Sequence, residues 1–75
     1  QDKKELLIMA LSRILEIDSE DQAALWERAE CHFDEKKMGD SMGDIHRLLA
    51  LNPGNQKARK FKAKILEKLD TREWD

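Results

Sequence analysis

Cysteine, proline and glycine are all scarce in this chain: its 75 residues include one cysteine, one proline and three glycines. The lone Cys31 has no partner for a disulfide within the chain, which predicts a reducing compartment, either the cytoplasm or the nucleus. Charged residues make up 40% of the chain and hydrophobic residues another 40%. This composition is typical of long amphipathic helices rather than of disorder.

Long hydrophobic runs are absent as well. No apolar run approaches the roughly 18 residues that a membrane-spanning helix needs, so we expect no membrane association. The short run Leu6–Leu11 could serve as the core of a signal peptide, but charged residues flank it and no small-residue cleavage site follows closely.

The chain also lacks a strong charge of one sign, since its formal net charge is −2. Residues 1–40 carry six Lys or Arg against eleven Asp or Glu, a net charge of −5. Residues 41–75 carry eight against five, a net charge of +3. The chain is therefore a dipole rather than a polycation, and its overall charge gives no support to nucleic-acid binding.

Four stretches place apolar residues at the spacing of one helix face. We expect helices over Lys3–Ile17, Gln22–Glu35, Ser41–Leu51 and Gln56–Leu69. Between the last two, Asn52 precedes Pro53 and Gly54 follows, so a helix has to end there. No stretch shows a strand pattern, and the sequence predicts an all-α fold of four helices.

The start of the third helix is the least sharply marked boundary. Gly39 and Asp40 are expected near the preceding turn, with Met38 packing at the entrance of the helix. Gly43 lies inside the helix at a cost of about 1 kcal/mol relative to Ala.

A set of apolar side chains is expected to form the contacts between helices. They are Leu11, Ile14, Leu15, Leu25, Ala29, Phe33, Ile45, Leu48, Ala58, Ile65 and Leu69. The first helix has more apolar residues than one stripe needs, because Leu6, Ile8, Met9 and Ala10 widen its face. It therefore predicts further partners, either an identical copy of the chain or the next repeat of a longer array.

The turn at Leu51–Gly54 has an earlier counterpart at Ile17–Glu20, thirty-four positions back along the chain. A shift by this period aligns 41 pairs, six of them identical. The contiguous similarity of residues 11–21 to residues 45–55 carries more weight, because it matches a helix end, a turn and a helix cap together. Recurrence at a fixed period indicates a repeat architecture.

With this period the sequence resembles the tetratricopeptide repeat, a helix–turn–helix unit of about 34 residues. Ala29 and Ser41 fall on the two small-residue positions of that family. Ile45 and Leu48 fall on packing positions of its second helix, and Pro53 on its closing proline. The resemblance implies a single domain over residues 1–75, with a half repeat over 3–21, a full repeat over 22–55, a half repeat over 56–69 and a tail over 70–75. It implies an α-α superhelix of antiparallel helical hairpins that acts as a non-enzymatic protein–protein interaction scaffold.

The chain departs from the family pattern in its second helix. Leu25 stands where the family often has tryptophan, with Trp26 one place on. His32 replaces the usual tyrosine, and Lys36 stands where glycine often ends the first helix of the unit.

A related family is the runner-up. Trp26, Ala29 and Phe33 also resemble the half-a-tetratricopeptide repeat of RNA-processing scaffolds. The period of the chain and the Asn52–Pro53 pair favour the ordinary repeat.

In tetratricopeptide arrays the first helix of each hairpin lines a groove that receives a peptide or helix of a partner. Carried over to this chain, the resemblance implies that the groove-facing residues are Ala23, Trp26, Glu27, Glu30, Phe33 and Asp34 on one helix and Lys57, Lys60, Phe61, Lys64 and Lys68 on the other.

Three lysines share a face independently of any family, because Lys57, Lys60 and Lys64 follow helical spacing. We expect them to bind an acidic segment of a protein partner, with Trp26 and Phe61 as apolar anchors. The predicted partner-binding residues are Trp26, Glu27, Glu30, Lys57, Lys60, Phe61 and Lys64. The alternative is that the lysines form a solvated face or pair with the acidic residues of the neighbouring helix.

Three other binding modes stay open. The chain could self-associate through the apolar face of Leu6–Leu15. It could bind RNA through Lys57, Arg59, Lys60, Lys62 and Lys64, although only one aromatic residue interleaves with these basic residues. Some family members grip the C-terminal carboxylate of a chaperone, and Lys57 and Lys60 would suit such a clamp, but Glu27 and Glu30 would repel an acidic tail.

Catalytic and metal chemistry find little support. Cys31 and His32 are adjacent, so on a helix they point about 100° apart and do not form a nucleophile–base pair; we expect both to pack inside a hairpin. Adding His46 gives no zinc-binding spacing, and Gly39 and Gly43 do not form a phosphate-binding loop. We therefore expect no enzyme activity, no cofactor and no metal.

Overall fold

The computed structural model describes residues 3–73, and the side chains of residues 3–69. Four helices account for most of this part: α1 (Lys3–Ile17), α2 (Gln22–Asp34), α3 (Met38–Leu51) and α4 (Gln56–Glu73). The prediction of an all-α fold with four helices is confirmed. Trp74 and Asp75, at the end of the predicted tail, lie outside the described residues.

Three predicted helix boundaries differ from the structure, the smallest difference being that α2 ends at Asp34, one residue before the expected Glu35. Helix α3 begins at Met38, three residues before the expected start, so Gly39 and Asp40 lie inside it. The turn before α3 needs only Glu35–Lys37, because Lys36 adopts a left-handed backbone with φ of 64°. Helix α4 continues beyond Leu69 to Glu73, since no proline or glycine interrupts this stretch.

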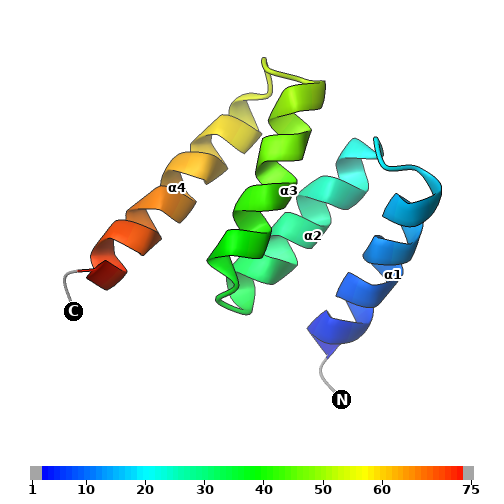
Figure 1. The fold of residues 1–75 in the computed structure, drawn as a ribbon, viewed down its shortest axis with the longest axis horizontal. Coiled ribbons are helices and arrows are strands. Elements are labelled where there is room, and N and C mark those ends of the chain that lie inside the picture. The colour runs from blue at the N-terminus through cyan, green and yellow to red at the C-terminus, as the bar shows by residue number, and fades with distance from the viewer. Residues whose placement is uncertain (1–2, 74–75) are drawn as a thin grey trace.

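Consecutive helices pack against each other as antiparallel neighbours, α1 on α2, α2 on α3 and α3 on α4. Figure 1 shows the four helices in chain order across the molecule, with α1 and α4 at opposite edges. The Cα trace extends over 39 × 36 × 14 Å, so the helices form a thin slab. In such a slab the two edge helices have fewer neighbours than the inner pair.

The core runs through all four helices. Its buried apolar residues are Leu11, Leu15, Ala24, Leu25, Ala29, Cys31, Ile45, Leu48, Ala58 and Ile65. Phe33 and Leu69 are partly buried and pack against this core. Ile14 was expected inside but is 41% exposed, because the main packing partner of α1 is α2 and Ile14 lies to one side of that contact.

The two turns that the repeat aligns share two types of hydrogen bond. The backbone N–H groups of Ala24 and Ala58 donate to the side-chain oxygens Asp21 Oδ1 and Asn55 Oδ1, each at 3.1 Å. The N–H groups of the same two capping residues donate to the carbonyl oxygens three residues earlier. Asp21 and Asn55 therefore cap α2 and α4 in the same way.

Candidate interaction face

Three aromatic rings join α2 to α4. The ring centroid of Phe61 on α4 lies 5.3 Å from that of Trp26 and 5.1 Å from that of Phe33, both on α2. The rings are tilted by 56° and 50°, within the range of favourable aromatic pairs. Trp26, Phe33 and Phe61, which we call the aromatic cluster, are all half-buried, so each keeps part of its surface in solvent.

A row of exposed lysines borders the aromatic cluster along α4. Lys57, Lys60, Lys64 and Lys68, which we call the lysine row, are all exposed. The ammonium group of Lys64 lies 5.2 Å from the centroid of the Phe33 ring, within the range of a cation–π contact. The lysine row and the aromatic cluster are therefore parts of one surface.

An acidic row lies on the other helix of this surface. Glu27, Glu30 and Asp34 on α2 are exposed. Within residues 3–69 no ion pair joins them to the lysine row; Asp34 instead lies 3.6 Å from Lys4 of α1. The pairing of the two rows that the sequence left open is not found in this part of the chain, and both rows face solvent.

The surface is hollowed at two places. Phe33, Asp34, Lys36, Met38 and Lys68 line a hollow at the far end of the aromatic cluster. A second, open hollow lies between α1 and α2 and is bordered by the acidic row. Its remaining lining residues are Lys4, Leu7 and Cys31.

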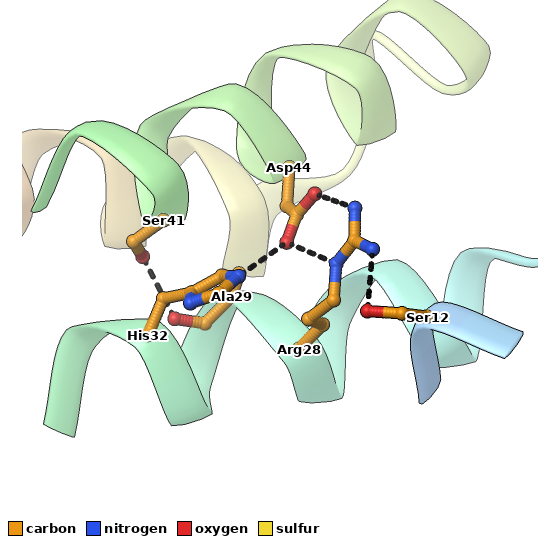
Figure 2. Close-up of polar contacts among 6 residues, drawn as sticks. All are labelled: Ser12, Arg28, Ala29, His32, Ser41 and Asp44. Atoms are coloured by element: carbon orange, nitrogen blue, oxygen red, sulfur yellow. Dashed lines mark hydrogen bonds and ion pairs between the residues drawn. The ribbon is translucent and has the colours of Figure 1, made fainter. Parts of the chain in front are cut away.

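A polar network that the sequence did not reveal ties three helices together (Figure 2). Arg28 of α2 donates from Nε to Asp44 Oδ2 at 2.9 Å and from Nη2 to Asp44 Oδ1 at 2.6 Å. Its Nη1 donates to Ser12 Oγ of α1 at 3.0 Å. The Asp44 side chain on α3 is only 8% exposed and that of Arg28 24%. The hydrogen bonds that Arg28 donates to Asp44 raise the pKa of Arg28 above its ordinary value, so the guanidinium stays charged.

His32 and Ser41 extend the network towards the α2–α3 turn (Figure 2). His32 Nε2 lies 3.8 Å from Asp44 Oδ2, while its buried Nδ1 has no hydrogen-bond partner. The Ser41 hydroxyl donates to the Ala29 carbonyl oxygen at 2.7 Å, and both residues are fully buried. Ala29 and Ser41, the two small residues, are therefore in direct contact between α2 and α3.

Sequence reasoning missed Arg28 and Asp44, although a signal was available. Asp44 lies on the face of α3 that also carries Ser41 and Leu48, since these residues follow i, i+3, i+7 spacing. A carboxylate on an otherwise buried face requires a cation from a neighbouring helix. Arg28, next to the buried Ala29, is that cation.

Cys31 and His32 both pack between helices, as expected: Cys31 lies against α1 and His32 against α3. Cys31 is 6% exposed, and burial raises the pKa of its thiol above the ordinary 9.0, with Asp34 and Glu30 adding to the shift. At neutral pH the thiol is therefore protonated and a poor nucleophile. Within the described residues, no group of three or more His, Cys, Asp or Glu side chains is arranged to hold a metal ion.

The helices of the described part include none that combines the length and hydrophobicity required to cross a membrane. Comparisons of the chain with protein-family models, curated proteins and solved structures found no match.

Proposed function

We propose that this chain is a tetratricopeptide-type interaction module that binds an acidic, extended segment of a protein partner along α4. The observation that carries the proposal is the aromatic cluster between α2 and α4, bordered by four exposed lysines. Half-buried aromatic rings beside exposed charges have the composition of binding hot spots. Catalysis has no part in this proposal.

The repeat assignment draws on local structure as well as sequence. The caps of α2 and α4, at equivalent positions of the repeat, make the same hydrogen bonds. Ala29 and Ser41, at the two small-residue positions of the resemblance, meet through a 2.7 Å hydrogen bond. Consecutive hairpins built in this way would stack into an α-α superhelix with α2 and α4 on one side.

The charges specify where the partner would lie. An acidic segment gains from the lysine row and is repelled by Glu27 and Glu30 on α2, so it would follow α4. Its apolar side chains would contact the exposed parts of Trp26 and Phe61. Because the lysines are exposed, they lose little hydration when a partner binds. Salt screens exposed charges, so the affinity for an acidic segment should fall as the salt concentration rises.

A display library of short disordered segments, selected on the immobilised chain, tests the proposal directly. We expect the selected peptides to be enriched in Asp and Glu together with apolar residues. Their affinity, measured by fluorescence anisotropy, should fall at least about tenfold for the triple variant Lys57→Glu, Lys60→Glu, Lys64→Glu. The three substitutions replace attraction between lysine and peptide carboxylates with repulsion between carboxylates.

A charge-matched variant serves as the control. Lys3, Arg13 and Arg47 are exposed and lie on α1 and α3, away from the lysine row. Changing these three to Glu alters the net charge equally and should leave peptide affinity within about twofold. Selected peptides without acidic enrichment, or equal binding by the lysine-row variant, would refute the proposal. Selection of RNA over peptides, with a steep salt dependence, would refute it in favour of a nucleic-acid role.

A further inference from the structure

The acidic row of α2 and the first three lysines of the lysine row on α4 follow the same i, i+3, i+7 spacing. Their residues are Glu27, Glu30 and Asp34 on α2 and Lys57, Lys60 and Lys64 on α4. All six side chains are exposed. On a helix this spacing places the charges of each row along one face, over a length of about 10 Å. The surface therefore carries two rows of opposite charge and equal length.

The aromatic cluster shows that the two rows lie at the same level. Phe61 contacts both Trp26 and Phe33, which are two helical turns apart, so its ring lies level with the stretch between them. Glu30 is in the middle of that stretch, and Lys60 adjoins Phe61. Helices α2 and α4 run in the same direction, because each is antiparallel to α3 (Figure 1). The two rows therefore run in parallel on either side of the aromatic cluster.

From this arrangement we infer that two copies of the chain pack face to face through this surface, as a dimer with twofold symmetry. A twofold axis that runs along the helices places α2 of each copy over α4 of the other. The contacts between copies are then Glu27 with Lys57, Glu30 with Lys60 and Asp34 with Lys64, each formed twice. Such an interface is closed, because both copies use the same surface.

The charges select this orientation of the dimer over the other face-to-face one. A twofold axis that runs across the helices would stack α2 on α2 and α4 on α4. Carboxylates would then face carboxylates and lysines would face lysines, and such like-charge contacts disfavour association. With the axis along the helices, every row faces a row of the opposite charge.

The aromatic cluster supplies the apolar centre of the contact. It lies between the two rows, so its exposed part lies next to the twofold axis and meets the same cluster of the second copy. Aromatic side chains at the centre of an interface, surrounded by polar residues, are typical of binding hot spots. Asp34 also lies 3.6 Å from Lys4 of its own copy, so we expect Glu27 and Glu30 to contribute most of the charge pairing.

The size and the polarity of the contact predict a weak, salt-sensitive dimer. Helix α2 has 13 residues and is therefore about 20 Å long. Two helices of this length give an interface in the class below about 1,200 Å², which binds weakly. Its ion pairs join exposed charges, which salt screens. An acidic partner would use the same lysines, so a bound acidic segment and a second copy exclude each other; the dimer itself needs no partner and is tested without one.

Sedimentation equilibrium on the intact chain, from about 10 μM to 1 mM, tests the inference. We expect the average mass to rise with concentration towards that of a dimer and to stop there. The dissociation constant should rise at least about tenfold between about 50 mM and 500 mM salt. A native chain that stays monomeric to about 1 mM at the lower salt concentration would overturn the inference, and so would a dimer that is insensitive to salt.

Two charge-reversed variants test the pairing itself. The first carries Glu27→Lys and Glu30→Lys, and the second carries Lys57→Glu and Lys60→Glu. Each variant alone should be monomeric, because like charges then face each other across the twofold axis. An equimolar mixture should form a one-to-one dimer, since every reversed charge meets an opposite charge on the other variant. A mixture that stays monomeric while both variants keep their helices, as measured by circular dichroism, would refute the predicted contact.

A variant with both Lys3→Glu and Arg13→Glu is the matched control. Both residues are exposed on α1, outside the two rows. The variant changes the net charge as much as Lys57→Glu with Lys60→Glu does, and it should dimerise within about twofold of the native chain. Loss of its dimer would show that net charge, rather than the pairing of the two rows, controls the association.

A carbodiimide cross-link, which joins a carboxylate directly to an amine, checks the register. Mixing ¹⁵N-labelled and unlabelled native chains allows mass spectrometry to identify links between copies. We expect links from Glu27 to Lys57 and from Glu30 to Lys60. Links between copies from Glu27 to Lys64 instead would contradict the predicted orientation, because about 10 Å of helix separates Lys57 from Lys64.

Discussion

At the scale of single residues, the Arg28–Asp44 pair is expected to dominate the polar contribution to stability. Arg28→Met leaves a carboxylate that is 8% exposed without its partner, and we expect the free energy of unfolding to fall by about 3 kcal/mol. Combining it with Asp44→Val removes both charges and should restore most of this loss. The measurement is urea denaturation of the two single variants and the double variant.

The thermodynamic cycle decides between the ion pair and simple packing. We expect a coupling energy of about 1.5–3 kcal/mol between the two positions, because each single variant leaves one buried charge unpaired. If the effects of Arg28→Met and Asp44→Val on the free energy of unfolding are additive, the coupling energy is zero and the ion pair does not stabilise the fold. Ser12→Ala, which removes only the third contact of Arg28, should cost about 1 kcal/mol and serves as the comparison.

The Cys31 thiol gives a second prediction at this scale. Native protein should react with a thiol reagent at pH 8 roughly 100-fold more slowly than the unfolded chain, since an opening free energy of about 3 kcal/mol is enough for that factor. The buried side chain and its raised pKa both act in this direction. Equal rates in native buffer and in urea would contradict the buried position.

The same raised pKa makes stability depend on pH. The unfolded thiol ionises near its ordinary pKa of 9.0, while the folded thiol ionises at higher pH. The thiol's stabilising contribution is therefore complete below pH 9 and is lost as the pH rises through the folded pKa. Cys31→Ala should show a smaller loss of stability between pH 8 and pH 10 than the native chain, measured by urea midpoints.

At the scale of helices, the backbone just after α2 is strained at Lys36, and a glycine there should relieve the strain. The N–H of Lys37 donates to the His32 carbonyl oxygen and that of Lys36 to the Phe33 carbonyl oxygen, which is the Schellman pattern, with Lys36 in the left-handed region. Lys36→Gly should raise the free energy of unfolding by about 1 kcal/mol, because glycine adopts this conformation without a Cβ clash. Thermal denaturation should show a rise of about 4–8 °C.

Lys37→Gly is the matched control for this prediction. Lys37 has φ of −95°, so glycine there relieves no clash and only adds flexibility to the unfolded chain. It should lower the melting temperature. A Lys36→Gly variant no more stable than the native chain would mean that the side chain at 36 makes a contact that offsets the backbone strain.

The contact between α2 and α3 can be tested with the two alanines of the repeat. Ala29→Leu overpacks a site that is 0% exposed and touches Ser41, so we expect a loss of about 1–3 kcal/mol. Ala63→Leu, at the equivalent but exposed position, should change stability by less than about 0.5 kcal/mol at micromolar concentration. Similar losses in both variants would contradict the difference between the inner and the edge helices.

At the scale of the whole molecule, a slab of four helices has two kinds of surface. Its broad face carries the aromatic cluster and the lysine row, and its two edges expose apolar residues such as Ile14 of α1 and Leu66 of α4. The partner proposal uses the broad face. Leu66→Glu, which leaves Lys57, Lys60 and Lys64 unchanged, should therefore keep the affinity for acidic peptides within about twofold.

Part of the candidate site was predictable because it depends on one helix at a time. The shared face of Lys57, Lys60 and Lys64 follows from helical spacing alone. The aromatic cluster required knowing that α2 and α4 lie close, which the repeat resemblance implied for Trp26 and Phe61. Arg28 and Asp44 were missed, since they are 16 residues apart and belong to different helices.

The sequence by itself determined that the chain forms four helices and where the first and last turns lie, because capping residues and the Asn52–Pro53–Gly54 stop act within a few residues of chain. The turn between α2 and α3, which depends on the left-handed backbone of Lys36, was not predicted. Only the tertiary structure decided which faces of those helices are covered. Ile14 and Leu48 are equivalent by sequence, yet one is 41% exposed and the other 1%. The spacing of apolar residues specifies a face, but burial depends on whether another helix lies against it.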